Sequence, residues 1–317
     1  GGGITIGSSG GSGSLNLYGG RISGNAAVNG GGIYIANNGS KLLVDGGVIE
    51  NNIVTGTTST SGRGGGLYVS GGTVTLSDGE IRGNQAIDGG GAYTTGSSSY
   101  FNLNGGRIFG NTATGDGGGM YVATSSKPTI TGGTITGNKA DGNGGGIYMA
   151  SGTVAVSGGE ITDNEAVGGG GAYIAGGTVT MSDGGIADNR AASGGGVYTT
   201  GSTGKFILDN GSISGNTSTG NGGGIYAVSS STATVNNGSI SGNNAAGNGG
   251  GIYTETTKLT VTGGTINGNK ADSNGGGIYY AASFTVSGGA IYTNTAGGAA
   301  NNLDGSAATR TASLKGG

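Results

Sequence analysis

Two aspartates, Asp163 and Asp188, are the residues whose type and spacing come closest to a metal or acid–base site. Each stands directly before an asparagine, in successive copies of one repeat. We expect them to lie one above the other, near enough for one pKa to rise or for a cation to bridge the carboxylates. The competing interpretation is a pair of solvated turn aspartates. The sequence favours it, because several other copies have glycine at that position.

Other charged side chains also recur at equivalent positions of successive copies. Glu50 should lie beneath Arg82, and Glu80 over Arg107. We interpret these as surface ion pairs, which contribute little individually.

Histidine and cysteine are absent from the chain. Their absence removes Ser–His and Cys–His nucleophile pairs, disulfides and thiolate metal sites. The glycine runs do not form a nucleotide-binding loop either, since no Gly-x-x-x-x-Gly-Lys-Ser/Thr stretch precedes a helix. We therefore predict no cofactor.

Tyrosine offers a different chemistry, because aromatic rings bind sugar rings and other aromatic surfaces. Ten tyrosines follow a Gly-Gly-Gly-apolar box, at Tyr34, Tyr68, Tyr93, Tyr121, Tyr148, Tyr173, Tyr198, Tyr226, Tyr253 and Tyr279. The apolar residue before each should point inward, so the phenols should form an exposed aromatic strip, here called the tyrosine strip. The strip is either a structural ladder in which each ring covers the next, or a surface that binds sugars or packs laterally against other molecules.

Asparagine forms a second column, here called the asparagine ladder. It recurs in an Ile-x-x-Asn box at Asn25, Asn52, Asn84, Asn111, Asn138, Asn164, Asn189, Asn216, Asn243, Asn269 and Asn294. A buried amide without partners would cost about 1–3 kcal/mol. We therefore predict that these amides point into a corner of the fold and hydrogen-bond up and down the stack.

A repeat of roughly 27 residues positions all of these side chains. Each copy contains the glycine–tyrosine box, an alternating stretch such as 73–79, and the Ile-x-x-Asn box. Apolar and polar residues alternate at period 2, and no window has a helical period. In one copy, Ile147, Val154, Val156, Ile161 and Ala166 should point inward. We predict an all-β parallel β-helix, or β-solenoid, of about eleven coils with three short strands each.

The whole chain, residues 1–317, is predicted to form a single β-solenoid domain. Its coils should start near residues 1, 30, 64, 89, 117, 144, 169, 194, 222, 249 and 275. Residues 297–317 should form a degenerate partial coil, in which 297–300 imitate the glycine box. Neither end has a recognisable cap, so we expect either further chain beyond the ends or end-to-end stacking of molecules.

The composition excludes several classes of protein. Glycine makes up 84 of 317 residues with only 1 proline, which excludes collagen. Charged residues are 9% and the net charge is −3, which excludes nucleic-acid binding through a basic face. No apolar run approaches the length of a membrane span, so none is expected in this segment.

The paired boxes Gly-Gly-Gly-Ile-Tyr and Ile-x-x-Asn resemble the repeats of the chlamydial polymorphic outer membrane proteins, which repeat Gly-Gly-Ala-Ile and Phe-x-x-Asn. Longer runs, such as 262–271 and 275–279, resemble repeat regions of large bacterial surface adhesins. The resemblance covers nearly the whole chain, with isoleucine replacing phenylalanine and a tyrosine added. It implies a right-handed parallel β-helix that is extracellular or at a bacterial cell surface.

We therefore expect a non-enzymatic extracellular structural or adhesive β-solenoid, either the stalk or passenger of a bacterial surface protein or the subunit of an extracellular fibre. The alternative is a carbohydrate-active β-helix enzyme, a polysaccharide lyase or hydrolase, which would need clustered carboxylates in a groove. Self-association, end to end or laterally, is the expected partnership. Surface glycans or a host-cell surface are further candidate partners.

Overall fold

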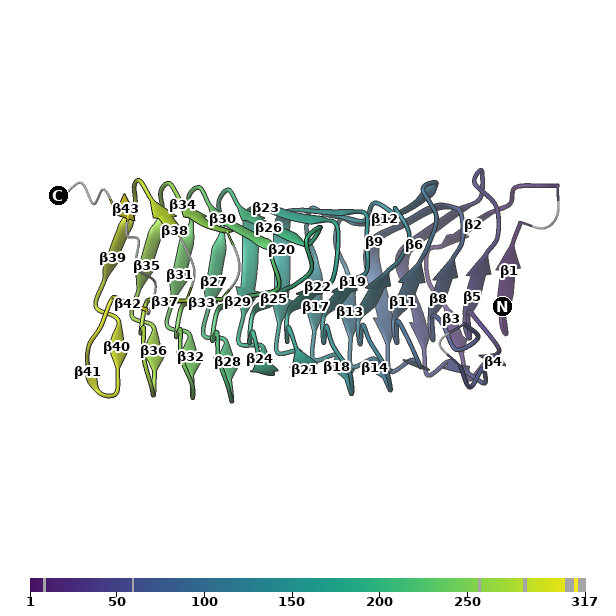
Figure 1. The fold of residues 1–317 in the computed structure, drawn as a ribbon. Coiled ribbons are helices and arrows are strands. Elements are labelled where there is room, and N and C mark those ends of the chain that lie inside the picture. The colour runs from purple at the N-terminus through teal and green to yellow at the C-terminus, as the bar shows by residue number, and fades with distance from the viewer. Residues whose placement is uncertain (8–9, 59, 256–257, 282–283, 306–310, 313–317) are drawn as a thin grey trace.

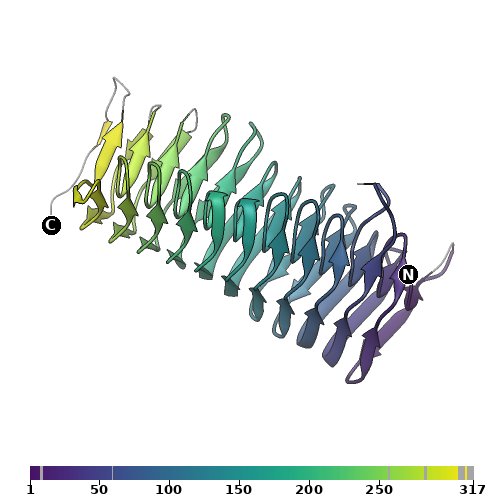
Figure 2. The ribbon, with the colours of Figure 1, turned by 90° about the horizontal axis from the view of Figure 1, so that it is seen from below.

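The computed structural model describes residues 1–7, 10–58, 60–255, 258–281, 284–305 and 311–312. The chain winds into a rod of stacked coils, with β1 at one end and β43 at the other (Figures 1 and 2). Three stacks of strands run along the rod, and among the described residues every strand pairing is parallel except that between β40 and β41. The predicted all-β parallel solenoid is confirmed.

The first stack holds the tyrosine boxes and contains 12 strands in the part of the chain that the structure describes. In most of its strands, two buried apolar residues flank an outward tyrosine, as the period of the box predicts. The strands are β1 (Ile4–Ile6), β5 (Ile33–Ile35), β8 (Leu67–Val69), β11 (Ala92–Thr94), β15 (Met120–Val122), β19 (Ile147–Met149), β22 (Ala172–Ile174), β25 (Val197–Thr199), β29 (Ile225–Ala227), β33 (Ile252–Thr254), β37 (Ile278–Tyr280) and β42 (Leu303–Gly305).

The second stack directly follows the asparagines and also has 12 described strands. These strands are short because the chain turns a sharp corner here, and alanine is the usual inward residue. They are β4 (Ala26–Ala27), β7 (Ile53–Val54), β10 (Gln85–Ala86), β14 (Thr112–Ala113), β18 (Lys139–Ala140), β21 (Glu165–Gly168), β24 (Arg190–Ser193), β28 (Thr217–Ser218), β32 (Asn244–Ala245), β36 (Lys270–Ala271), β40 (Thr295–Ala296) and β41 (Ala299–Ala300).

The third stack covers the remaining two sides of the coil. Some coils contribute one long strand that continues around a bend, and the others contribute two short strands separated by a turn. The long strands are β6 (Lys41–Glu50), β9 (Gly72–Arg82), β20 (Thr153–Thr162) and β23 (Thr178–Ala187). The short strands are β2 (Ser14–Leu17), β3 (Arg21–Ser23), β12 (Ser99–Leu103), β13 (Arg107–Phe109), β16 (Thr129–Ile130), β17 (Thr134–Thr136), β26 (Lys205–Leu208), β27 (Ser212–Ser214), β30 (Thr232–Val235), β31 (Ser239–Ser241), β34 (Lys258–Val261), β35 (Thr265–Asn267), β38 (Phe284–Val286), β39 (Ala290–Tyr292) and β43 (Thr311–Ala312).

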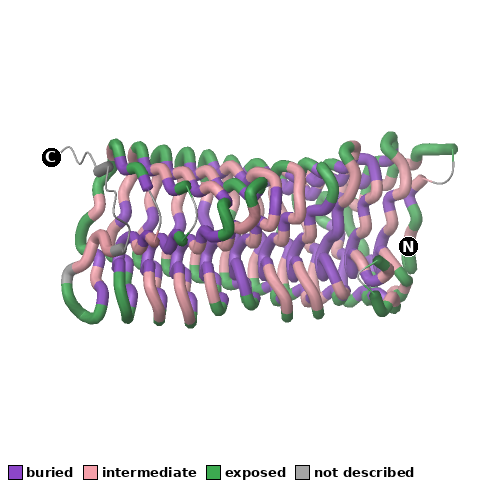
Figure 3. Tube along the Cα trace, viewed as in Figure 1, coloured by how far each residue is buried: buried purple, intermediate pink, exposed green. Residues whose placement is uncertain are grey.

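A continuous apolar core fills the rod from Ile6 to Val286. The inward residues predicted for one coil, Ile147, Val154, Val156, Ile161 and Ala166, are all buried. Figure 3 shows buried segments along the coil walls and exposed segments at the turns. Each coil is too thin to bury these side chains by itself, so the coils above and below complete the core.

Three consecutive glycines in each coil meet three different constraints, as Gly144, Gly145 and Gly146 illustrate. Gly144 has φ +69, in the left-handed region that favours glycine. A Cβ on Gly145 would lie 2.6 Å from two backbone oxygens of neighbouring segments. A Cβ on Gly146 would lie 2.6 Å from a backbone oxygen of the next coil and 3.1 Å from Nδ2 of Asn164. The glycine box and the asparagine therefore recur together because the amide passes through the space that the glycine leaves.

The structure differs from the sequence-based expectation at residues 297–300. Gly297 and Gly298 have positive φ and reverse the chain, so β41 pairs antiparallel to β40 in the second stack. The glycine box is therefore not repeated there, and the first stack continues only with β42, where Leu303 lies opposite Ile278. Residues 306–310 and 313–317 of the predicted partial coil lie outside the described residues.

Candidate functional site

The asparagine ladder lies inside the corner between the third and second stacks. Ten of its members are buried, and Asn25 is partly exposed. Nδ2 of Asn164 donates to the carbonyl of Ile135 and to Oδ1 of Asn189, both at 2.9 Å. Oδ1 of Asn164 accepts from the backbone N–H and from Nδ2 of Asn138, both at 3.0 Å. All hydrogen-bonding positions of this amide are occupied within the fold, so the ladder links coils and leaves no group for a ligand.

The last ladder bond reaches a residue outside the repeat. Oδ1 of Asn302 accepts from the backbone N–H of Asn294 at 3.2 Å and from its Nδ2 at 3.1 Å. Asn302 is only 8 residues away, because the chain reversal at Gly297 and Gly298 returns it to the corner. This end of the ladder is therefore closed by the local hairpin.

The tyrosine strip runs along the outside of the first stack. Ring centroids of successive tyrosines are 4.6 to 5.3 Å apart. Most pairs are nearly parallel, and the pair of Tyr198 and Tyr226 is tilted by 51°. These distances are typical of favourable aromatic contacts. The strip is a continuous column of ring faces in contact, with the ring edges at the surface.

The tyrosine strip is less exposed than the sequence predicts. Tyr93 and Tyr253 are buried, at 3% and 9% exposure, and the other eight tyrosines are half-buried. Each ring covers the faces of its neighbours, and the guanidinium of Arg63 lies 4.9 Å from the ring centroid of Tyr93. Burial raises the pKa of Tyr93, Tyr198 and Tyr253 to about 12.

A pair of carboxylates beside the strip was missed by sequence reasoning. Oδ1 of Asp88 accepts from the backbone N–H of Asp116 at 3.1 Å, which places the two residues in successive coils. Asp116 in turn accepts from the backbone N–H of Asn143 at 2.7 Å. Burial raises the pKa of both carboxyl groups above the usual value. Both residues stand directly before a glycine box, where aspartate commonly forms a turn, so the sequence alone does not single them out.

Asp163 and Asp188 lie in successive coils, on the turn between the third stack and the asparagine ladder. Both residues are exposed, and both have a left-handed backbone conformation, with φ of 56° and 55°. Equivalent turns have glycine with similar φ, for example Gly137 and Gly215. Within the described residues, no three acidic side chains gather into a set that could hold a metal ion. The geometry of the two aspartates is that of solvated turn residues.

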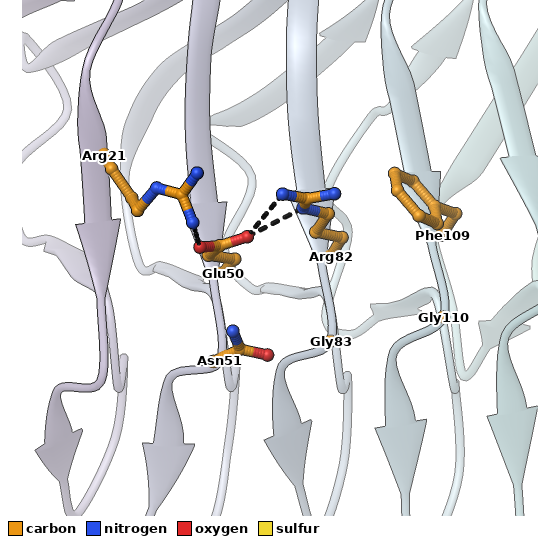
Figure 4. Close-up of a pocket in the computed structure, with 7 residues that line it drawn as sticks. All are labelled: Arg21, Glu50, Asn51, Arg82, Gly83, Phe109 and Gly110. Carbon is orange, nitrogen blue, oxygen red and sulfur yellow. Dashed lines mark hydrogen bonds and ion pairs between the residues drawn. The ribbon is translucent and has the colours of Figure 1, made fainter.

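A charged recess lies at the same turns in the first four coils (Figure 4). It has a volume of about 490 Å³ and is lined by Arg21, Glu50, Asn51, Arg82, Gly83, Phe109 and Gly110. We call it the arginine hollow. β3, β6, β9 and β13 bring these residues together, because Glu50 is in register with Arg82, and Arg82 with Phe109.

Glu50 is the buried centre of the arginine hollow, with only 5% of its side chain exposed. One carboxylate oxygen pairs with Nη1 of Arg21. The other is 2.7 Å from both Nε and Nη2 of Arg82. The prediction that Glu50 and Arg82 form a weak surface pair is corrected, since burial and a second arginine make this a three-residue cluster.

Arg107 differs from its predicted pairing with Glu80. The two residues are in register, but the Arg107 guanidinium lies 4.3 Å from the ring centroid of Phe109. Glu80 instead lies 3.3 Å from Nε of Arg82. A charged or aromatic residue in each of four successive coils was the sequence signal for this cluster.

Comparison with known protein families matches residues 2–184 to the right handed beta helix region. Residues 210–228 and 263–281 match the Chlamydia polymorphic membrane protein repeat. Each of these two segments contains one Ile-x-x-Asn box and the following glycine–tyrosine box, which are the motifs behind the resemblance. No curated protein and no solved structure matches the chain. Across the part of the chain that the structure describes, no helix is long and apolar enough to cross a membrane.

Proposed function

The chain belongs to the family of right-handed β-helix proteins, and on this basis we propose that it is a non-enzymatic structural or adhesive β-solenoid at a bacterial surface. In this proposal it is the stalk or passenger of a surface protein, or the subunit of an extracellular fibre. The two matches to the Chlamydia polymorphic membrane protein repeat support the surface location.

The observation that supports the proposal most strongly is the continuity of the contacts between coils. The tyrosine strip and the asparagine ladder cross every boundary from the second coil to the eleventh. A hydrogen bond contributes about 1 kcal/mol net, and an aromatic pair contributes about 0.5–1.5 kcal/mol. Because these terms repeat at each boundary, they resist bending and separation of coils, which is what a spacer requires.

The described side chains support the enzyme alternative less well than the structural or adhesive role. The arginine hollow has one lining carboxylate, Glu50, and two arginines bind it. A lyase or hydrolase would need a carboxyl group free to exchange protons with a substrate.

Electron microscopy of the purified 317-residue chain tests the rod. We expect straight particles, because coils that rise about 4.8 Å each should build a rod on the order of 50 Å long. Sedimentation at micromolar concentration then distinguishes isolated stalks from fibres that associate end to end or laterally. Flexible or collapsed particles would contradict the proposal.

Two further measurements test location and chemistry. Antibodies against the chain should label intact cells of the producing bacterium, and labelling only after lysis would rule out a surface role. Incubation with a panel of polysaccharides should release no new reducing or unsaturated ends, whereas cleavage that depends on Glu50 would establish the enzyme alternative.

A further inference from the structure

The arginine hollow is where charged and aromatic side chains of four successive coils gather on one wall of the rod. On either side of the buried isoleucine of the third stack, several later coils have small hydroxyl side chains, such as Ser212 and Ser214 beside Ile213, and larger residues such as Glu160 and Tyr292 occur singly. The equivalent positions of the first four coils include Arg21, Glu50, Arg82 and Phe109. A spacer does not need such a gathering of charged side chains, so this cluster calls for a separate explanation.

Glu50 holds the two arginines in place. Its buried carboxylate binds Nη1 of Arg21 and both Nε and Nη2 of Arg82. A guanidinium has five N–H donors, so both arginines keep donors beyond these bonds. The side chains of Arg21 and Arg82 are 58% and 35% exposed, and both line the hollow. The arginines are therefore ordered before any ligand arrives, which reduces the entropy lost on binding.

The local charge favours an anion. Arg21, Arg82 and Arg107 contribute three positive charges against the two negative charges of Glu50 and Glu80, an excess of one in a chain whose net charge is −3. Arg107 is fixed against the ring of Phe109. Guanidinium groups bind carboxylate, sulfate and phosphate through paired hydrogen bonds.

Three left-handed turn residues in successive coils line the floor of the hollow. They are Asn51, Gly83 and Gly110, with φ of 52°, 60° and 61°. A Cβ added to Gly110 would have no atom within 4 Å, apart from those of Gly110 and its two neighbours in the chain. A smaller recess of about 180 Å³ adjoins the hollow, shares Asn51 and Gly83, and is also lined by Gln85. The amide groups offer both donors and acceptors along this floor.

We propose that the arginine hollow binds an acidic saccharide. The carboxylate or sulfate of a uronic or sulfated sugar pairs with Arg21 and Arg82, and the ring hydroxyls bond to Asn51. A recess of about 490 Å³ is larger than a bare oxyanion requires and is within the range of sites for small molecules. The adjoining recess accommodates a neighbouring sugar unit beside Gln85.

This site adds a specific ligand class to the proposed surface role and does not depend on it. Both carboxylate oxygens of Glu50 are paired with arginines, so the proposal is binding and not cleavage. Rod formation is measured by microscopy and saccharide binding by calorimetry, so each proposal can fail alone.

Gly110→Asp is the decisive variant, because the chain itself places aspartate at this turn position. Asp163 and Asp188 occupy it with φ of 56° and 55°, so the substitution is compatible with the fold. It puts a carboxylate into the hollow, where it fills space and repels an anionic ligand. Gly137→Asp is the matched control, since Gly137 has φ +61 and lies one coil beyond the hollow.

Titration calorimetry with tetragalacturonate, a heparin tetrasaccharide, a neutral dextran oligosaccharide and inorganic sulfate tests the proposal. We expect at least one acidic oligosaccharide to bind, with Gly110→Asp weakening it roughly tenfold or more and Gly137→Asp leaving it unchanged. The proposal is overturned if neither acidic oligosaccharide binds or if dextran binds equally well. It is also overturned if sulfate alone binds as tightly as the sugar, or if both aspartate variants bind like the original chain. Microscopy of each variant confirms that the rods are intact.

Discussion

The asparagine ladder and the tyrosine strip have the same period, but the rod uses them differently. Asn164 is buried, and each donor and acceptor of its amide is bonded to another coil or to the backbone. Tyr148 is half-buried and stacks on its neighbours with ring centroids 4.7 and 5.2 Å apart. One column satisfies polar groups inside the fold, and the other covers its outside.

The ends of the two columns show what each position requires. At the C-terminal end, the ladder is closed by another asparagine, Asn302. In register with the tyrosine strip, Thr5 stands at one end and Asp304 at the other. The buried position needs a short side chain with both a donor and an acceptor, whereas the outer position accepts different side chains. The asparagines and the tyrosines therefore recur with the same period but contribute unequally to the stability of the rod.

The largest expected effect comes from Asn164→Ala. The substitution removes four side-chain hydrogen bonds, so the buried backbone N–H of Asn138 loses its acceptor and the carbonyl of Ile135 loses the amide donor. Oδ1 of Asn189 keeps only the bond from the backbone N–H of residue 164. We expect a loss of roughly 3–5 kcal/mol in the free energy of unfolding, at about 1–3 kcal/mol per unsatisfied group. Urea denaturation followed by circular dichroism measures it. Asn143→Ala, at a partly exposed turn, is the control, and equal effects at the two sites would remove the distinction between ladder and turn asparagines.

Gly146→Ala should have the next largest effect, because a Cβ there meets a backbone oxygen at 2.6 Å and crowds the amide of Asn164. We expect a loss of roughly 2–3 kcal/mol from overpacking. Gly137→Ala is the comparison, since its φ is +61 but its Cβ position is empty, and it should lose about 1–2 kcal/mol. Both are measured by thermal unfolding. If Gly137→Ala is the more damaging, then backbone conformation, and not space for the ladder, explains the glycine box.

Tyr148→Ala should destabilise the rod less than Asn164→Ala or Gly146→Ala. It removes ring contacts with Tyr121 and Tyr173, and we expect a loss of roughly 1–2 kcal/mol. Tyr148→Phe keeps the contacts and should change stability by less than about 0.5 kcal/mol. Urea denaturation of both variants separates stacking from the hydroxyl. A phenylalanine variant as unstable as the alanine variant would show that the phenol oxygen is what matters.

Alkaline pH should leave the rod unchanged near neutrality and weaken the tyrosine strip only at high pH. Burial raises the pKa of Tyr93, Tyr198 and Tyr253 from the unperturbed value of 10.0 to about 12. A raised pKa means that the folded state retains its protons while the unfolded chain releases them. Stability is therefore intact below about pH 10 and is lost as pH rises through about 12.

Phenolate absorbance measures this shift directly. The strip of the folded rod should ionise at higher pH than the same chain in denaturant, and the melting temperature should fall over the same interval. Coincident titration curves would mean that the rings are as solvated as in the unfolded chain.

The amino-acid sequence by itself determined the coil and the inward column of each strand. Successive side chains of a strand point to opposite faces. Alternation at period 2 therefore places Ile147, Val154 and Val156 on the inner face of the coil. The Ile-x-x-Asn box also placed Asn164 correctly at a corner, since its spacing from the buried isoleucine never varies.

Only the tertiary structure decided which outward side chains become buried. Glu50 is enclosed by Arg21, 29 residues earlier, and by Arg82, 32 residues later. Asp88 meets Asp116, and Tyr93 is covered by Arg63, through contacts that likewise cross between coils. Strand alternation assigns a residue to a face, but its burial depends on how long side chains from the coils above and below lie across it. That arrangement is set by packing between coils and is not contained in any single repeat.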